Sequence, residues 1–268
     1  MDLGVRGAAA VVTGGTKGMG RSTAEFLARD GARVAVFARG RESLDEAVGA
    51  LRSLGSPDPI GLSVDVGDTG SVTAAFEQLA ARWGVLNVLV NTVGPGLTGT
   101  IDEFTDDQWA ATFNMGTMSA VRCVRAALPL LRKAGWARIV NVSAHSTKRQ
   151  TPTLIGYTAS KAALTSFSKN LAKTLAPEGI LVNTVSPGTF LTGGVRDWLE
   201  EMAAKRGIDP TSLEDLNRVI AEDFGEPSDL GRAGLPDEIG AVIAFLGSKA
   251  NSYMTGADVN VDGGSDFT

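Results

Sequence analysis

Tyr157 and Lys161 have the residue types and the spacing that proton transfer requires. Four residues apart on a helix, the phenol and the ammonium group lie on one face, and the positive charge favours the phenolate. The lysine is therefore expected to lower a tyrosine pKa that is ordinarily about 10. A tyrosine tuned in this way can give or take a proton near neutral pH. Such pairs occur by chance on many helices, but this one follows a β-branched segment that ends at Ser143.

The glycine-rich segment Thr13–Gly20 has the composition of a phosphate-binding turn. It follows a short apolar run and precedes a helical pattern, so free N–H groups and the helix dipole would stabilise a diphosphate there. Its spacing, Gly-x-x-x-Gly-x-Gly, differs from the commoner Gly-x-Gly-x-x-Gly pattern of dinucleotide sites. An ordinary tight turn is the alternative, but the position between a strand and a helix favours nucleotide binding. The candidate cofactor contacts in this turn are Gly14, Thr16, Lys17, Gly18, Met19 and Gly20.

The residues after the second expected strand favour a phosphorylated cofactor. A site for NAD(H) usually has a carboxylate there that holds the ribose hydroxyls, and the segment Val36–Arg41 contains none. Arg39, with Lys17 and Arg41, could instead pair with a 2′-phosphate through charge-assisted hydrogen bonds. The alternative is that these cations are solvated surface charges. The pattern predicts NADP(H) as the preferred cofactor and leaves NAD(H) as a second possibility.

Short β-branched runs alternate with longer helical patterns, which is typical of a parallel sheet covered by helices on both faces. The sequence therefore predicts an α/β fold of three layers. At the end of the third run, Asp65 and Val66 are placed to meet the amino group and the ring face of an adenine. The expected strands are Ala9–Val12, Arg33–Phe37, Ile60–Val64, Val88–Thr92, Arg138–Val142, Ile180–Val185 and Asp258–Val261.

Helix signals occupy the intervals between these runs. Apolar residues repeat at helical spacing before Gly55 and before Gly84, and each glycine is a plausible helix stop. Thr105 and Gln108 form the pattern of a capping box, which predicts a helix from there towards Leu128.

Residues 190–232 are longer than a plain connection between a strand and a helix requires. Helical pieces are expected at Trp198–Lys205 and Leu213–Phe224, and apolar residues such as Phe190 and Trp198 are mixed with charged ones. We interpret this stretch as a lid over a binding cleft, with Trp198 as a candidate substrate contact, within a single domain of residues 1–268. A surface insertion that only packs down is the alternative.

The composition excludes several classes of function. The 268 residues include 25 Lys and Arg against 30 Asp and Glu, a net charge of −5, so the basic field that nucleic acid or an anionic membrane requires is lacking. The single cysteine, Cys123, excludes an internal disulfide, and the lone His145 cannot build a metal site by itself. The apolar run near the N-terminus is too short for a membrane span or a signal peptide. We therefore expect a cytoplasmic protein with no metal, nucleic-acid or membrane partner.

Jointly, these features resemble the short-chain dehydrogenase/reductase family in its single-domain form, over essentially the whole chain. The resemblance implies a Rossmann-type, doubly wound, seven-stranded parallel sheet with helices on both faces. It also implies NAD(P)(H) bound at the carboxyl edge of the sheet and hydride transfer between nicotinamide and a ketone or secondary alcohol. The matching segments are Thr13–Gly20, Asp65, Asn91–Gly94, Asn114, Tyr157 with Lys161, Pro187–Gly188, Thr255–Gly256 and Val261–Gly264.

The resemblance also implies roles for individual residues. Tyr157 would be the acid/base, Lys161 would lower its pKa and hold the nicotinamide ribose, and Asn114 would support a proton-relay water beside Lys161. The further cofactor contacts that it implies are Asn91, Gly94, Pro187, Gly188, Phe190 and Thr192.

The family pattern is broken at Ala144. The family's catalytic serine, which polarises the substrate carbonyl, most often stands thirteen residues before the tyrosine, and that position is alanine here. Ser143 is our first choice as its replacement, although neighbouring residues of a strand point to opposite faces. Ser146, His145 and a water molecule are the alternatives, and His145 is also a candidate substrate contact.

The sequence thus predicts an NADPH-preferring carbonyl reductase, reversible as a dehydrogenase. A 3-oxoacyl thioester, a steroid and a polyketide-like carbonyl all fit as substrates. The alternative is a catalytically weak or regulatory NADP(H)-binding protein, for which Ala144 is the positive indication. Relatives in the family imply a homotetramer or dimer, assembled through residues 106–131 and 156–176 and through the last strand.

Overall fold

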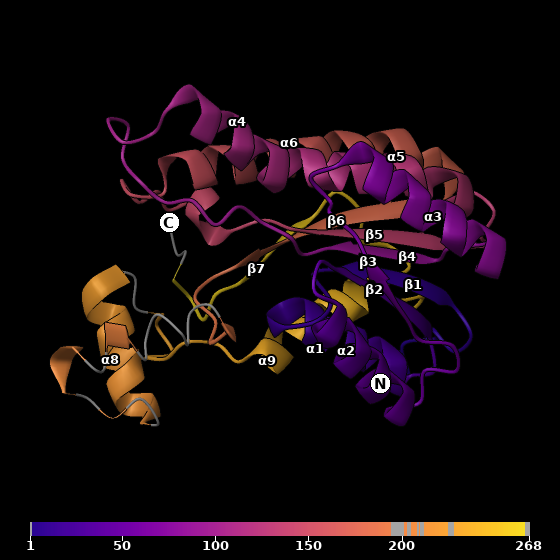
Figure 1. Cartoon of the computed structure of the whole chain (residues 1–268), viewed down its shortest axis with the longest axis horizontal. Helices are drawn as coiled ribbons and strands as arrows, with labels where there is room; N and C mark the ends of the chain where they lie inside the picture. Colours follow the sequence, from indigo (N-terminus) through magenta and orange to yellow (C-terminus); the bar gives the residue numbers. More distant parts are fainter. Residues whose placement is uncertain are drawn as a thin grey trace.

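One sheet of seven parallel strands forms the centre of the protein, in the order β3-β2-β1-β4-β5-β6-β7 (Figure 1). The structure, a computed structural model, describes residues 2–193, 201–202, 205–207, 209, 212–224 and 228–265. Every strand expected from the sequence is present, with ends that shift by at most two residues. The strands are β1 (Ala9–Thr13), β2 (Arg33–Ala38), β3 (Ile60–Ser63), β4 (Val88–Asn91), β5 (Ala137–Val142), β6 (Ile180–Pro187) and β7 (Asp258–Val261).

Helices cover both faces of the sheet, which confirms the doubly wound three-layer α/β fold. One face carries α1 (Gly18–Arg29), α2 (Arg41–Ser53) and α9 (Pro236–Leu246). The other carries α3 (Thr69–Trp83), α4 (Asp106–Phe113), α5 (Ser119–Leu131) and α6 (Ile155–Leu175) (Figure 1). The remaining described elements are the helix α8 (Leu213–Phe224), the π-helix η1 (Asn114–Met118) and the 3₁₀ helices η2 (His145–Thr147) and η3 (Ala176–Glu178).

The alternation of side chains along each strand divides the core into two clusters. In β1, Ala9 and Val11 pack with residues of α3, α5 and α6, whereas Ala10 and Val12 pack with residues of α1 and α9. All four side chains are fully buried. The chain leaves β1 towards β2 on one side and later returns to β4 on the other, so the strand order reverses between β1 and β4. Ligands of open α/β sheets bind at the carboxyl ends of the strands beside such a reversal.

The helix after Thr105 begins as expected and then contains an irregularity. Thr105 and Gln108 form the predicted capping box, with side-chain to backbone hydrogen bonds in both directions. The predicted path towards Leu128 is interrupted by η1, a π-helical turn that separates α4 from α5. No single residue type marks a π turn, so the sequence did not predict it. Such turns occur frequently at functional sites.

The predicted glycine stops are also confirmed. α3 ends at Trp83, and Gly84 caps it with a φ of 69° in the left-handed region. α2 ends at Ser53, shortly before Gly55, whose φ is 109°. Glycine adopts these conformations without the steric cost of a side chain.

Of the segment interpreted as a lid, residues 190–232, the structure describes part. The helix predicted at Leu213–Phe224 is present as α8, and its Asn217 side chain accepts a hydrogen bond from the N–H of Ala233 at 2.8 Å. Trp198 lies outside the described residues, so its predicted substrate contact stays a prediction. None of the described helices is both long enough and apolar enough to span a bilayer.

A buried row of polar side chains joins β4, β5 and α6. Asn91 Nδ2 donates to Asn141 Oδ1, and Asn141 Nδ2 donates to Ser168 Oγ, both at 2.8 Å. Replacing Asn141 by alanine removes both hydrogen bonds and leaves buried polar groups unpaired, so we expect the free energy of unfolding to fall by roughly 2–4 kcal/mol. Denaturant unfolding measures this loss. The exposed Asn170 on α6 is the control, because its replacement by alanine should change stability little; equal effects of the two would contradict the role of this row.

Candidate active site

The turn between β1 and α1 is packed closely at its glycines. Gly14 and Gly18 have φ values of 66° and 56°, in the left-handed region that favours glycine. A Cβ on Gly20 would lie 2.5 Å from the carbonyl oxygen of Gly14. The first turn of α1 has no acidic residue, and no side chain caps its N-terminus. The turn therefore presents the positive end of a helix dipole and helix N–H groups without intrahelical partners, as an anion site requires.

A cavity of about 810 Å³ lies against this turn, at the carboxyl ends of β1, β2, β3 and β4. Its volume falls within the range of small-molecule and cofactor sites. Residues from six separate places in the sequence meet in its wall, which is where a dinucleotide would lie at a topological switch point. The predicted cofactor contacts that line it are Gly14, Thr16, Lys17, Gly18, Met19, Gly20, Arg39, Asp65, Val66, Gly94 and Thr192.

After β2, the structure distinguishes between Arg39 and Arg41, the two arginines that the sequence offered for a 2′-phosphate. Arg39 lines the cavity, whereas Arg41 does not. Ser43, in the first turn of α2, also lines it and donates a hydrogen bond to Gly40 O at 3.0 Å. The sequence analysis did not single out Ser43. Its position in the first turn of α2, where a serine can face an anion at the helix N-terminus, could have indicated it. Two cations, Lys17 included, and a second helix N-terminus thus line the same cavity, which suits a phosphate group.

The turn after β3 forms another part of the wall. Asp65 Oδ1 accepts a hydrogen bond from the N–H of Gly67 at 2.8 Å, which fixes the carboxylate beside the backbone. Met115 of η1 also lines the cavity, and its sulfur would lie 3.2 Å from a Cβ on Gly67. The sequence did not single out Met115, because it reaches the cavity only through the π turn.

Lys161 extends from α6 to the carboxyl end of β5. Its Nζ donates a hydrogen bond to Val142 O at 2.7 Å, and a Cβ on Gly94 would lie 3.1 Å from the same nitrogen. Because Gly94 lines the cavity, the ammonium group lies directly behind the cavity wall. Burial lowers the pKa of Lys161 to about 8. The amine therefore still carries its charge over most of the neutral range.

Tyr157 lies one helical turn before Lys161 and is half-buried. Burial raises the pKa of Tyr157 to about 12, so the predicted lowering by Lys161 is not present in this structure. The physical reason is that desolvation penalises the phenolate, while the Lys161 ammonium is directed at the carbonyl of Val142. The phenol is consequently neutral at physiological pH and holds a proton that it can donate.

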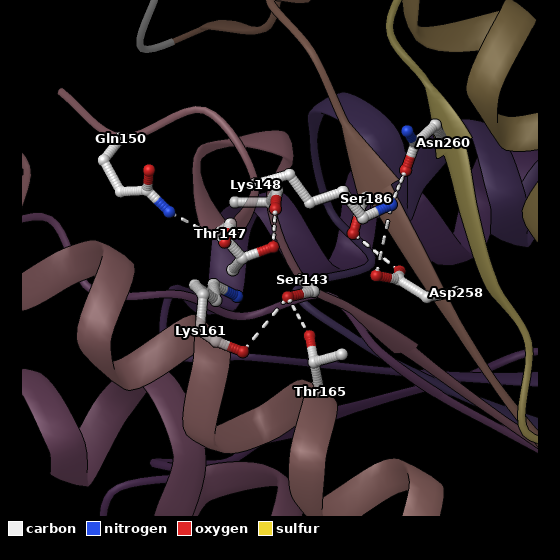
Figure 2. Close-up of polar contacts among 10 residues, drawn as sticks. Ser143, Thr147, Lys148, Gln150, Lys161, Thr165, Ser186, Asp258 and Asn260 are labelled. Carbon is white, nitrogen blue, oxygen red and sulfur yellow. Dashed lines mark hydrogen bonds and ion pairs between the residues drawn. The ribbon is translucent and has the colours of Figure 1, made fainter. Parts of the chain in front are cut away.

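The structure does not support the catalytic role that we predicted for Ser143. Its hydroxyl lies 2.7 Å from Thr165 Oγ1 and donates to Lys161 O at 3.1 Å, so it points into the interface between β5 and α6 (Figure 2). Thr165 lies two helical turns beyond Tyr157. The alternation of side chains along the extended backbone explains the outcome, because it turns Ser143 and Ala144 to opposite sides.

The alternatives to Ser143 lie on η2. Ser146 is buried and accepts a hydrogen bond from the hydroxyl of Thr158 at 3.1 Å. His145 Nδ1 lies 3.0 Å from Pro187 O, and because a carbonyl oxygen only accepts, this nitrogen carries the proton. His145 therefore links the segment after β5 to the carboxyl end of β6. The same segment is tied to β7 by Lys148, whose ammonium contacts Asn260 and lies 3.5 Å from Asp258 Oδ2 (Figure 2).

Of the predicted cofactor contacts on and after β6, Thr192 lines the main cavity, whereas Pro187, Gly188 and Phe190 do not. A Cβ on Gly188 would lie 2.8 Å from Asp262 Cα, so no side chain fits there, while Thr192 lies over the glycine turn with its methyl group 3.2 Å from a Cβ on Gly18. Phe190 is buried, packs on Gly234 and lines a smaller cavity of about 100 Å³, so the structure does not bring it to the main cavity. The carbonyl oxygen of Pro187 accepts the hydrogen bond from His145 Nδ1.

Two predicted asparagines lie near the site without lining the main cavity: Asn91 is buried and Asn114 is half-buried. Asn91 belongs to the buried polar row of β4, β5 and α6 and does not line the main cavity. Asn114 is the first residue of η1, and its Nδ2 lies 3.4 Å from Gly67 O. The structure thus brings the glycine turn, Arg39, Asp65 and Lys161 around one cavity, and places Tyr157 on the helix that carries Lys161.

The chain is similar to known reductases over nearly its whole length. Residues 14–266 match a family model described as Enoyl-(Acyl carrier protein) reductase. The chain is 32% identical over 258 residues to the short-chain reductase protein NovJ of Streptomyces niveus, covering 95% of this chain and 92% of that protein.

Solved structures are similar over the whole length. The L-sorbose reductase of Gluconobacter frateurii, complexed with NADPH and L-sorbose, has a TM-score of 0.93 and 30% identity, covering 100% of both chains. An NADPH-bound short chain oxidoreductase from Pseudomonas aeruginosa PAO1, described as containing an atypical catalytic center, has a TM-score of 0.85 and 33% identity, covering 96% of both chains.

Proposed function

Because this chain belongs to the short-chain dehydrogenase/reductase family, whose named relatives are oxidoreductases, we propose that it reduces ketones with NADPH as its preferred cofactor. The observation that carries the proposal is the position of Lys161, whose ammonium lies behind Gly94 in the wall of the cavity, one turn from the neutral phenol of Tyr157. These two side chains supply a proton donor and a positive charge on one helix, and the cavity that Gly94 lines suits a dinucleotide.

The residues of the cleft fit a phosphorylated dinucleotide. The glycine turn lines the cavity and presents the N-terminus of α1, which has no acidic residue in its first turn and no side-chain cap, so its free N–H groups suit a diphosphate. Arg39 and Lys17 supply positive charge for a 2′-phosphate, and Asp65 with Val66 lines the wall where an adenine would bind. The NADPH complexes of similar solved proteins support this choice of cofactor.

When bound, the cofactor supplies the hydride that the carbonyl carbon accepts. Tyr157 donates its phenolic proton to the carbonyl oxygen, which completes the alcohol and leaves a phenolate. Lys161 then stabilises the phenolate with its ammonium charge, and a proton from solvent restores the phenol. In the direction of alcohol oxidation the same residues act in reverse.

Ala144 removes the hydroxyl that would polarise the substrate, and Ser143 points away from the cleft. We propose that His145 contacts the substrate instead. Its ring is held by Pro187 O at the carboxyl ends of β5 and β6, next to Ala144. The similar protein described as containing an atypical catalytic center supports catalysis by a modified set of residues.

The proposed substrate is a ketone, and L-sorbose is the first one to test because its reductase is similar over the full chain. A 3-oxoacyl thioester and a steroid ketone complete the panel that the sequence suggests. The lid of residues 190–232 and the homotetramer or dimer remain predictions.

The experiment is NADPH binding by fluorescence, followed by NADPH oxidation with each member of the carbonyl panel. We expect saturable binding and turnover of at least one ketone. Binding without any turnover would favour the regulatory alternative, which Ala144 supports. Failure to bind either NADPH or NADH would contradict the cofactor assignment itself.

A further inference from the structure

We propose that Arg122 is a positioning residue for the active site, which fixes Asn114 and the π turn η1 against the helix that carries Lys161. Arg122 lies on α5, is half-buried, and has no contact with the proposed catalytic tyrosine or lysine among the described interactions. The inference rests on the proposed function, because it assigns a role within the same site.

Arg122 holds the side chain of Asn114 from one side. Its Nη2 donates to Asn114 Oδ1 at 2.6 Å, and its Nε donates to Thr69 Oγ1 at 3.1 Å. On the other side, Asn114 Nδ2 donates to Gly67 O at 3.4 Å. Both ends of the amide are thus engaged, and the guanidinium bridges η1 to the first turn of α3. A planar guanidinium has several donors in fixed directions, which is what a bridge between two acceptors requires.

The π turn is what brings Arg122 into line with Asn114. In a regular α-helix each residue advances about 100°, so residues eight apart differ by about 80° around the axis. A π turn takes up one additional residue, which brings the difference to about 20° in the other direction. Asn114 O accepts the N–H of Ser119, five residues on, as this geometry requires. The π turn η1 therefore places Arg122 of α5 on the same side of the helix axis as Asn114.

The π turn in turn contacts the residue before Lys161. A Cβ on Gly116 would collide with the side chain of Ser160, and Thr117 Oγ1 donates to Ser160 O at 2.7 Å. A contiguous set of contacts therefore runs from Arg122 through Asn114 and η1 to Ser160 and Lys161. Because packed side chains transmit small displacements, loosening Asn114 should displace the ammonium and phenol from their positions for proton transfer.

Arg125 offers a matched control on the same helix. It lies nearly one turn further along α5, is exposed, and lines the same groove of about 400 Å³ between α3 and α5 that Arg122 lines. It has no hydrogen bond to Asn114 among the described contacts, so its removal changes the charge of the groove without changing the support of η1.

The test compares Arg122→Met, Arg122→Lys and Arg125→Met with the parent enzyme. For Arg122→Met we expect kcat to fall roughly tenfold to hundredfold, while the Kd for NADPH and the KM for the ketone change by less than about threefold. Arg122→Lys should recover part of kcat, because one ammonium can bond Asn114 or Thr69 but not hold the planar bridge. Arg125→Met should match the parent in kcat, Kd and melting temperature.

A crystal structure of Arg122→Met gives a second readout that does not depend on turnover. Displacement of the Asn114 side chain from Gly67 O, with a shift of η1, supports the proposal. An unmoved Asn114 together with an unchanged kcat overturns it, as does an equal loss of kcat in Arg125→Met. If the parent enzyme binds NADPH but reduces no ketone, the proposed function fails, and an Asn114 left in place in the crystal structure then overturns the positioning role as well.

Discussion

Replacing Tyr157 by phenylalanine should lower the rate of ketone reduction by roughly 10²- to 10⁴-fold, the range that general acid catalysis contributes. The variant loses one hydroxyl and keeps the ring, so the packing of α6 and the cleft beside it are preserved. The pKa of about 12 means that the phenol is protonated throughout the neutral range, so the substitution removes a proton that the phenol could donate. Affinity for NADPH should stay within about threefold of the parent, because the cofactor contacts come mainly from other residues.

Tyr253 provides the control for this variant, because it is the only other tyrosine in the chain and is 98% exposed. Tyr253→Phe should leave both kcat and NADPH affinity unchanged. Stopped-flow measurement of NADPH oxidation separates the chemical step from product release. If Tyr157→Phe retains most of the rate of that step, the assignment of Tyr157 as the proton donor is wrong.

Replacing Arg39 by methionine should weaken NADPH binding about tenfold while leaving NADH binding nearly unchanged. A hydrogen-bonded contact with a charged group contributes about 1.5 kcal/mol or more, which corresponds to about tenfold in Kd. Arg39 is exposed, so the lower end of the range applies because solvent screens the interaction. The ratio of the two dissociation constants, measured by fluorescence titration, gives the contribution of the 2′-phosphate to binding, because NADPH and NADH differ only in that group.

Arg41 is the matched control, since it carries the same charge two residues away and does not line the cavity. Arg41→Met should alter neither dissociation constant by more than about twofold, apart from a weak long-range effect that salt screens. Equal losses for NADPH and NADH in Arg39→Met would show that Arg39 supports the cleft as a whole, and the proposed recognition of the 2′-phosphate would then be incorrect.

Local sequence signals were sufficient for the sheet and for most of the cleft. Strands such as Ala9–Thr13 are short, β-branched or small, and bounded by turn residues, so they can be located without tertiary information. The glycine turn could be placed as well, because only glycine tolerates the φ values and the close approach at Gly14 and Gly20. Once strands and turns are known, parallel pairing brings the residues that follow β1 to β4 to one edge.

Side-chain direction could not be obtained in the same way. Ser143 was the natural replacement for the missing serine by position, yet one residue of register turns its hydroxyl towards Thr165. The pKa of Tyr157 was predicted from its nearest charge alone, whereas the folded protein adds desolvation and gives Lys161 another partner in Val142. Phe190 likewise packs on Gly234 instead of facing the cavity.

Taken by itself, the sequence determined the α/β sheet, the position of the glycine turn, the cationic end of the cleft at Arg39 and the spacing of Tyr157 with Lys161, because each depends on residues near one another in the chain. Only the tertiary structure decided which hydroxyl points where, how burial shifts the two pKa values, and that a π turn aligns Arg122 with Asn114. These properties arise from contacts between segments distant in the sequence, such as Arg122 with Thr69 and Lys161 with Gly94, and desolvation exists only once such segments have packed together.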